Sequence, residues 1–135
     1  MPDITLEDRI AIHEVIALHG HLIDDREWDR LGEVFTDDIV FDITDFGYGT
    51  LYGLPAMLDL VNGVQSDENQ PLGHHVTNIV ITRQDGETVT THSKGLAVAA
   101  DGAAGSAVYE DTLRRDPQGW RIAYRKAMAR RTIRE

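Results

Sequence analysis

Two adjacent histidines, His74 and His75, are the residues of this sequence best suited to proton transfer near neutral pH. They lie in the run Gly73-His74-His75-Val76-Thr77-Asn78, where a segment of turn-forming residues gives way to a β-branched one. A histidine that faces a cavity can act as a base if a carboxylate orients its ring. Alternation along a strand places the two rings on opposite faces, and neither face is clearly polar, so the pattern does not choose between them.

The usual signatures of other chemistries are missing from the sequence. It contains no cysteine, no Gly-rich phosphate-binding loop, no Gly-x-Ser-x-Gly run and no His-x-x-x-His or Cys-x-x-Cys metal pattern. We therefore expect neither a metal nor a nucleotide cofactor. Any catalysis would depend on histidines, carboxylates and arginines.

The first long apolar stripe contains a histidine and is followed by a carboxylate. His19 shares its stripe with Ile12, Val15 and Leu22, and this spacing favours a core histidine with a satisfied hydrogen bond. Asp24 lies five residues later, which is about 140° away around a regular helix. Asp24 could therefore join His19 in a pocket only if the helix ended or distorted near Ile23.

Strand alternation also sorts the polar residues of the last two predicted strands. Tyr109 and Asp111 share the face that we expect to point inward, where a carboxylate needs a partner. On the final strand Trp120, Ile122 and Tyr124 have the pattern of core residues. This interpretation leaves Arg125 on the solvated face.

Composition limits the class of protein. With 135 residues and a formal net charge of −10, we expect one domain over residues 1–135 and no nucleic-acid partner, because phosphate binding needs a basic surface. The first residues lack a secretory pattern, and no apolar run approaches the ~20 residues of a membrane span. The absence of cysteine fits a reducing compartment. We therefore predict a cytoplasmic protein without membrane contact. We interpret the basic residues between Arg125 and Glu135 as a solvated strand end and tail, and not as a binding site for nucleic acid.

The predicted elements are helices first and strands afterwards. A capping box at Thr5-Leu6-Glu7-Asp8 opens the first helix, and a short second helix carries Trp28, Leu31 and Phe35. Residues 39–43 alternate as a strand, Pro55 begins a third helix, and residues 63–73 are loop-like. Four antiparallel strands follow, over about 74–82, 87–99, 105–114 and 120–130, with turns at Asp85-Gly86, at Asp101-Gly102 and at residues 116–119. This order predicts an α+β fold in which a strongly curved antiparallel sheet closes over the helices as a cone-like barrel with a pocket.

The same order of elements and several runs of sequence resemble the SnoaL-like branch of the nuclear-transport-factor-2-like (NTF2-like) superfamily. The runs are Ile23-Asp24-Asp25-Arg26-Glu27-Trp28-Asp29-Arg30-Leu31, Val34-Phe35-Thr36-Asp37-Asp38, His74-His75-Val76-Thr77-Asn78, Tyr109-Glu110-Asp111 and Gly119-Trp120-Arg121-Ile122-Ala123-Tyr124-Arg125. The resemblance spans nearly the whole chain. It implies the cone-shaped α+β fold, which hosts enzymes and inert binding domains alike.

Within that branch the pattern is similar to lyases with an Asp–His dyad, such as scytalone dehydratase, bile-acid 7α-dehydratase and hexachlorocyclohexane dehydrochlorinase. The resemblance implies Asp24 as the carboxylate, His74 rather than His75 as the base, and Arg125 as a stabiliser of negative charge. It therefore overrides the spacing arguments for Asp24 and Arg125. His19 takes a position that the family usually fills with Tyr or Lys, and there we expect a histidine that titrates near neutrality.

Three functions remain open from the sequence. The first is a cofactor-independent dehydratase in which His74 removes a proton and His19, Tyr48 or Tyr52 protonates the departing hydroxyl. The second is an isomerase or aldol cyclase with the same dyad, and the third is a non-catalytic ligand-binding or dimerisation domain. We expect a small hydrophobic substrate and a homo-oligomer, either trimer or dimer. The expected substrate contacts are Trp28, Tyr48, Tyr52, Met57, Asn78, Tyr109 and Asp111.

Overall fold

A computed structural model describes residues 3–64 and 70–131 of the chain. The first helix, α1 (Leu6–Asp24), begins with the predicted capping box: the Thr5 hydroxyl accepts from the Asp8 N–H at 3.0 Å, and the Asp8 carboxylate accepts from the Thr5 N–H at 2.9 Å. The predicted apolar stripe is the buried face of this helix, because Ile12, Val15, Ile16, His19 and Leu22 are all buried.

The remaining elements are η1 (Trp28–Glu33), β1 (Phe35–Asp42), η2 (Thr44–Phe46), β2 (Thr50–Tyr52), α2 (Leu54–Val64), β3 (Gly73–Asp85), β4 (Thr88–Val98), β5 (Ala104–Asp116) and β6 (Gly119–Arg130). The predicted elements among them follow in the expected order, and two short elements, η2 and β2, were not predicted. The four long strands and their three turns agree with the prediction. Gly86 and Gly102 have positive φ at the first two turns, as tight hairpins require.

Two local predictions were wrong. Phe35 is not on the face of the short helix, because β1 begins at Phe35, four residues earlier than predicted, and pairs there with Ile122 of β6. The short strand β2 was predicted as loop, since glycines flank it and three residues carry too little alternation to be recognised. Of the predicted loop over residues 63–73, residues 65–69 lie outside the described part of the chain, as do residues 132–135 of the basic tail.

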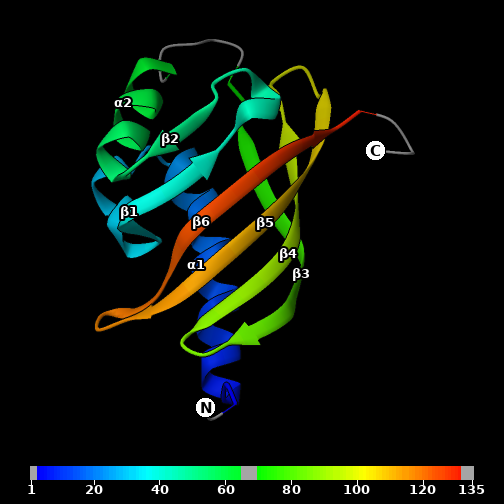
Figure 1. Ribbon diagram of the computed structural model, residues 1–135. Helices are drawn as coiled ribbons and strands as arrows, with labels where there is room; N and C mark the ends of the chain where they lie inside the picture. The colour runs from blue at the N-terminus through cyan, green and yellow to red at the C-terminus, as the bar shows by residue number, and fades with distance from the viewer. Residues whose placement is uncertain (1–2, 65–69, 132–135) are drawn as a thin grey trace.

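The sheet is mixed and open. Its strand order is β2-β1-β6-β5-β4-β3, and all neighbours are antiparallel except β1 and β6, which run parallel. The edge strands β2 and β3 do not pair with each other, so the predicted curved sheet is open, and the parallel pair β1–β6 makes it mixed and not wholly antiparallel as predicted. Helix α1 lies across the concave face of this sheet, with α2 beside the β1–β2 end (Figure 1).

A bulge in β6 decides which residues of that strand point inward. Thr112 pairs with Tyr124 but Leu113 pairs with Ile122, so Ala123 is an extra residue on β6. The extra residue reverses the alternation: Ile122 and Arg125 are both fully buried, whereas Tyr124 is only half-buried. The strand-based interpretation of Arg125 as a surface residue was therefore wrong.

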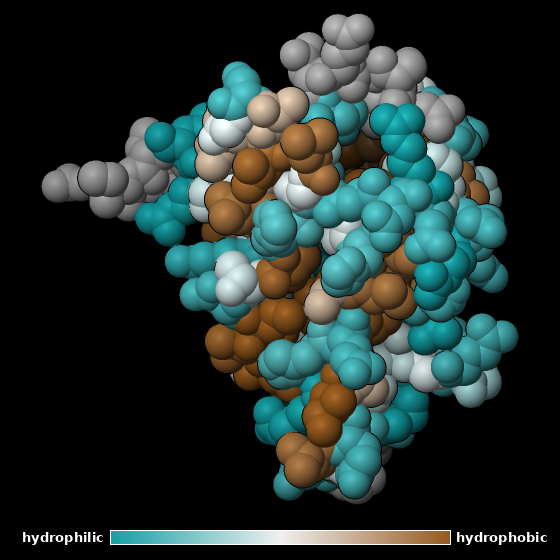
Figure 2. All heavy atoms as spheres, turned by 180° about the vertical axis from the view of Figure 1, so that it is seen from behind, coloured by the Kyte–Doolittle hydropathy of each residue, from teal (hydrophilic) through white to brown (hydrophobic). Residues whose placement is uncertain are grey.

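The core lies between α1 and the concave face of the sheet. Its fully buried members include Ile12 and Ile16 of α1, Ile39 of β1 and Leu113 of β5. On the helix side of the molecule, hydrophobic side chains gather in several patches among hydrophilic ones, and a hollow near the top is lined with hydrophobic residues (Figure 2). Among the described residues, no helix has the length and apolarity needed to cross a membrane.

Candidate active site

Asp24 and His74 form a hydrogen-bonded pair. The ring Nδ1 of His74 lies 2.7 Å from Asp24 Oδ1, and the main-chain N–H of His74 donates to both carboxylate oxygens at 2.9 and 3.1 Å. A carboxylate accepts hydrogen bonds, so it selects the His74 tautomer that carries its proton on Nδ1. Nε2 of His74 then keeps its lone pair. About a fifth of each side chain is exposed, so the pair is accessible from outside the core.

A close approach between α1 and β3 brings these residues together. A Cβ built on Gly20 would lie 2.5 Å from the carbonyl oxygen of His74, so only glycine allows the two backbones to approach this closely. Asp24 lies four residues after Gly20 and therefore on the same helix face. Helix α1 ends at Asp24, one residue after Ile23, and the N–H of Asp25 closes the last turn on His21. The helix therefore ends near Ile23, which is the condition that the sequence analysis set for Asp24.

A cavity of about 510 Å³ opens beside this pair, between α1, α2 and the concave face of the sheet. His19 and His74 both line it, and most of the other lining side chains are apolar or aromatic. They include Ile23, Phe41, Met57, Val61 and Tyr109. The volume suits a small organic molecule, and the two imidazoles are the histidines that reach it.

Behind the cavity wall lies a buried chain of polar side chains. Arg125 is fully buried and donates from Nε and Nη2 to the two oxygens of Asp111, at 2.7 and 2.9 Å. Its Nη1 donates to Nδ1 of His19 at 3.0 Å. Burial opposes the charge on Arg125, but the Asp111 carboxylate outweighs this effect and raises the pKa of Arg125. The inward Asp111 predicted from the sequence therefore has the partner that its burial requires.

The ionisation of His19 differs from the expectation. Burial, and then the charges of Arg125 and His74, lower the pKa of His19 well below its ordinary value. His19 therefore does not titrate near neutrality and stays neutral there. The resemblance did not indicate this, because the causes are the burial of the His19 ring and the charges near it, among them the guanidinium that reaches it from β6.

Tyr109 completes the polar side of the cavity. Its ring lies over the Arg125 guanidinium at 4.4 Å and edge-on to His19 at 6.3 Å. The ring occupies the space above Gly95 on β4, where a Cβ would lie 2.6 Å from it. Burial raises the pKa of Tyr109, so its hydroxyl stays protonated. Gly20 and Gly95 are site residues that the sequence analysis did not identify, and a glycine inside a helix or strand was the available signal.

Comparison with known proteins gives the family. The SnoaL-like domain matches residues 5–126 of the chain. The chain belongs to the SnoaL-like domain family. No curated protein matches it significantly.

Solved structures place this SnoaL-like domain in the NTF2-like fold. An NTF2-like protein with a cystatin-like fold from Novosphingobium aromaticivorans is 27% identical, with a TM-score of 0.75 over 92% of this chain and 82% of the other. A hexachlorocyclohexane dehydrochlorinase (LinA) of type 2 is 23% identical, with a TM-score of 0.75 over 93% and 87%. A Nostoc punctiforme protein of unknown function, 16% identical, has a TM-score of 0.82 over 98% of both chains. The last two similarities show the fold.

The structure separates the predicted site residues of this SnoaL-like domain into two groups. Met57, Tyr109, His19 and His74 line the cavity, with Asp24 paired to His74 at its edge. Arg125 and Asp111 lie behind His19 and not on the cavity surface, and Arg125 contacts the lining residues His19, by a hydrogen bond, and Tyr109, whose ring lies over the guanidinium. The predicted contacts outside the lining are Trp28, Tyr48, Tyr52 and Asn78.

The positions of these four residues in the fold explain why they do not line the cavity. Tyr48 and Tyr52 are 53% and 72% exposed, on the loop and strand beyond η2. Asn78 is exposed with a φ of 56° at a bulge of β3, a backbone conformation that asparagine tolerates. Trp28 begins η1 and packs against the core cluster. Contacts between these residues and a substrate remain predictions.

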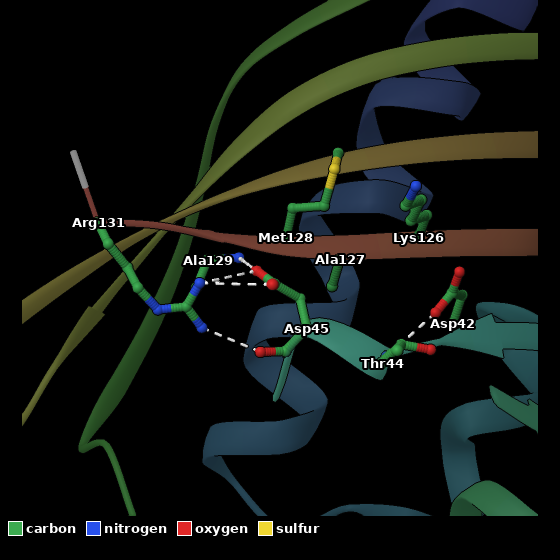
Figure 3. Close-up of a pocket in the computed structure, with 8 residues that line it drawn as sticks. All are labelled: Asp42, Thr44, Asp45, Lys126, Ala127, Met128, Ala129 and Arg131. Atoms are coloured by element: carbon green, nitrogen blue, oxygen red, sulfur yellow. Dashed lines mark hydrogen bonds and ion pairs between the residues drawn. The ribbon is translucent and has the colours of Figure 1, made fainter. Parts of the chain in front are cut away.

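A second, more open depression lies where η2 meets the end of β6. Asp45 accepts a hydrogen bond from the Ala129 main-chain N–H at 2.7 Å and forms an ion pair with Arg131 at 3.2 Å, and Figure 3 shows both contacts converging on the Asp45 carboxylate. Ala129 and Arg131 also line the cavity. The Asp45 contacts therefore hold η2 against β6 beside the cavity rim.

Proposed function

We propose that this SnoaL-like domain is a cofactor-independent lyase of the dehydratase type, which acts on a small hydrophobic hydroxy-carbonyl compound. The observation that carries the proposal is the Asp24–His74 pair, with 2.7 Å between Oδ1 and Nδ1, at the edge of an apolar cavity. A fixed tautomer leaves Nε2 of His74 available as a base, and the Asp24 carboxylate stabilises the imidazolium that forms when the base accepts a proton.

The proposed reaction begins with proton abstraction. Nε2 of His74 removes a proton from the carbon α to a carbonyl, and the electron pair moves to the carbonyl oxygen as an enolate. Collapse of the enolate forms a carbon–carbon double bond and expels hydroxide from the β-carbon. His74 then gives its proton to the departing hydroxide, which leaves as water. Tyr48 and Tyr52 do not line the cavity, so we assign no proton transfer to them.

One observation supports a second candidate, an isomerase or aldol cyclase. His19 is held neutral by burial and by Arg125, so it is a poor acid for a leaving hydroxyl. A dehydratase must then use the proton on His74 for the leaving hydroxide, whereas an isomerase has no leaving group and needs His74 only to return that proton to another carbon of the enolate. Both candidates share the first step and therefore the same base.

Two probe compounds test the shared step and the elimination separately. The first is 2-indanone, a compact ketone whose α-protons exchange in D₂O through an enolate, with incorporation followed by mass spectrometry. The second is 4-hydroxy-4-phenylbutan-2-one, which gains a conjugated ultraviolet absorbance when it loses water. We expect the wild-type protein to catalyse exchange of 2-indanone, and the second probe to show whether elimination follows.

Matched variants connect the activity to the dyad. Asp24→Asn and His74→Gln should each lower kcat/KM for exchange by roughly 10²–10⁴-fold, as loss of an oriented base does. The controls are Asp25→Asn and His75→Gln, which alter the exposed neighbours. Equal rates in all four variants would exclude the dyad mechanism, and binding of 2-indanone without exchange would favour a ligand-binding domain.

A further inference from the structure

One nitrogen of the Arg125 guanidinium, Nη1, makes no hydrogen bond to the Asp111 carboxylate. Nε and Nη2 are both committed to Asp111, and the side chain is fully buried, so its position is fixed. In this position Nη1 lies 3.0 Å from Nδ1 of His19. The rings of Tyr109 at 4.4 Å and Phe35 at 5.7 Å lie against the guanidinium and limit its movement.

This contact determines where the proton of His19 lies. A guanidinium has only donors, so Nδ1 of His19 must accept the hydrogen bond from Nη1 and cannot itself carry a proton. The neutral imidazole therefore carries its proton on Nε2. His74 has the opposite tautomer, because its Nδ1 faces the acceptor oxygen of Asp24.

The proton on Nε2 of His19 is available to a ligand. The His19 ring lines the cavity, and within residues 3–64 and 70–131 no hydrogen bond joins its Nε2 to another group. The charged or titratable groups that face the ring are Arg125 from β6, Tyr109 from β5 and His74 from β3. The cavity thus has a lone pair on one imidazole and an N–H on the other.

We propose that His19 is a neutral hydrogen-bond donor that binds the carbonyl oxygen of the substrate and stabilises the enolate. In this proposal Asp111 and Arg125 are positioning residues that lock the tautomer of His19. The substrate is accordingly a ketone or related carbonyl compound, whose oxygen meets Nε2 of His19 while its α-carbon meets Nε2 of His74. This inference rests on the proposed function, since the enolate forms only if His74 is the base.

The arrangement suits an enolate for electrostatic reasons. A donor that is already oriented needs no reorganisation as negative charge develops on the oxygen, and its effect is larger in a buried, apolar site. The positive charge of Arg125 on the far side of the ring polarises the His19 N–H toward the cavity. His19 donates this hydrogen bond and keeps its proton. No other acid is therefore needed to reprotonate His19 after each turnover.

Nitrogen NMR of the histidine rings in the wild-type protein tests the tautomers directly. We expect His19 as the neutral Nε2–H form near neutral pH, and we expect the neutral form of His74 to carry its proton on Nδ1. A doubly protonated His19, or one protonated only on Nδ1, would overturn the proposal. The measurement needs neither a substitution nor a ligand, so it does not depend on whether a variant folds.

Carbonyl binding is tested with 2-indanone labelled with ¹³C at its carbonyl. Hydrogen bonding to the oxygen should move the carbonyl resonance downfield in the wild-type protein and in His74→Gln. The shift should be lost in His19→Phe, which has no donor, and partly recovered in His19→Gln, which restores one. Exchange of the α-protons should fall by roughly 10²–10³-fold in His19→Phe, which is the range for loss of one oxyanion donor.

The outcomes distinguish this inference from the proposed function. A carbonyl shift that persists in His19→Phe, or is absent from the wild-type protein, overturns the role of His19 even where exchange proceeds through His74. A His19-dependent shift without exchange in the wild-type protein refutes the proposed base and retains the carbonyl site.

The positioning role of Arg125 and Asp111 is tested by the tautomer of His19, which a loss of stability alone would not change. In the double variant Arg125→Met/Asp111→Leu, both charges are removed together, and His19 loses the donor that fixes its tautomer. We expect the Nδ1–H form of His19 to appear in its spectrum, while His74 keeps the tautomer set by Asp24. An unchanged tautomer of His19 in this variant would show that Arg125 does not set it.

Discussion

Gly20 of α1 lies against the main chain of His74 on β3, with space for a hydrogen atom and not for a methyl group. A Cβ at this position would meet the His74 carbonyl oxygen at 2.5 Å, which is too close for a non-bonded contact. Because Asp24 lies one helical turn beyond Gly20, the same contact sets the distance between the carboxylate and the imidazole. The packing of α1 against β3 therefore determines the geometry of the Asp24–His74 pair.

We predict that Gly20→Ala impairs both stability and activity. The added methyl must push α1 away from β3, and overpacking of this kind costs about 1–3 kcal/mol in the free energy of unfolding. A displacement of ~1 Å at the dyad can lower the rate by up to ~10²-fold. Deuterium exchange of 2-indanone and urea unfolding measure the two effects. The control is Gly63→Ala in α2, where no atom lies near the position of the new methyl. A fully active Gly20→Ala protein would disprove the link between the contact and the dyad.

Removal of one partner from the buried Arg125–Asp111 pair should be far more damaging than removal of both. Arg125→Met leaves the Asp111 carboxylate buried without its bidentate partner, which we expect to cost about 3–5 kcal/mol in the free energy of unfolding. Arg125→Met/Asp111→Leu replaces the pair with apolar side chains of similar volume and should recover most of that loss. Denaturant unfolding of the wild type, of Arg125→Met and Asp111→Leu singly, and of the double variant checks this, and additive effects of the two substitutions would contradict it.

The burial of His19 predicts a pH dependence of stability. The pKa of His19 is lowered in the folded protein from its ordinary value of 6.5, so below that pH the unfolded chain binds a proton that the folded chain excludes. The contribution of neutral His19 is therefore fully present above pH 6.5 and decreases as the pH falls toward the folded value. The free energy of unfolding should decrease less steeply with acidification in His19→Phe. Parallel pH curves for the two proteins would rule out the effect.

Asp8 should make the start of α1 sensitive to acid. Hydrogen bonds from Arg115, from the Thr5 N–H and from Trp120 hold the pKa of Asp8 below its ordinary value of 3.8. Its contribution to stability is thus present above that value and is lost as the pH falls through the lower, folded value. Asp8→Asn should be less stable than wild type at neutral pH, and the difference should shrink in acid. Glu7→Gln, in the same turn, is the control for charge at the helix end. A difference that does not change with pH would contradict this assignment.

Local patterns in the sequence were sufficient for most of the secondary structure. The capping box of Thr5 and Asp8, the buried stripe of α1 and the hairpin turns at Gly86 and Gly102 agree with the structure. These features depend on residues that are neighbours along the chain, so their interactions are encoded by spacing alone. The short strand β2 and the early start of β1 were missed because distant partners stabilise them: β1 pairs with β2 and, in parallel, with β6.

For the candidate site as well, one part follows from the sequence and another part only from the tertiary structure. The sequence by itself determined the residue types and, through the resemblance, the choice of Asp24 and His74. Only the tertiary structure decided that Arg125 points inward, because the extra residue Ala123 reverses the alternation of β6. It also decided that Arg125 meets His19 and not the cavity, and that Gly20 brings Asp24 to His74. A bulge and a backbone contact depend on the pairing of distant segments, and the spacing of residues within one segment does not contain that information.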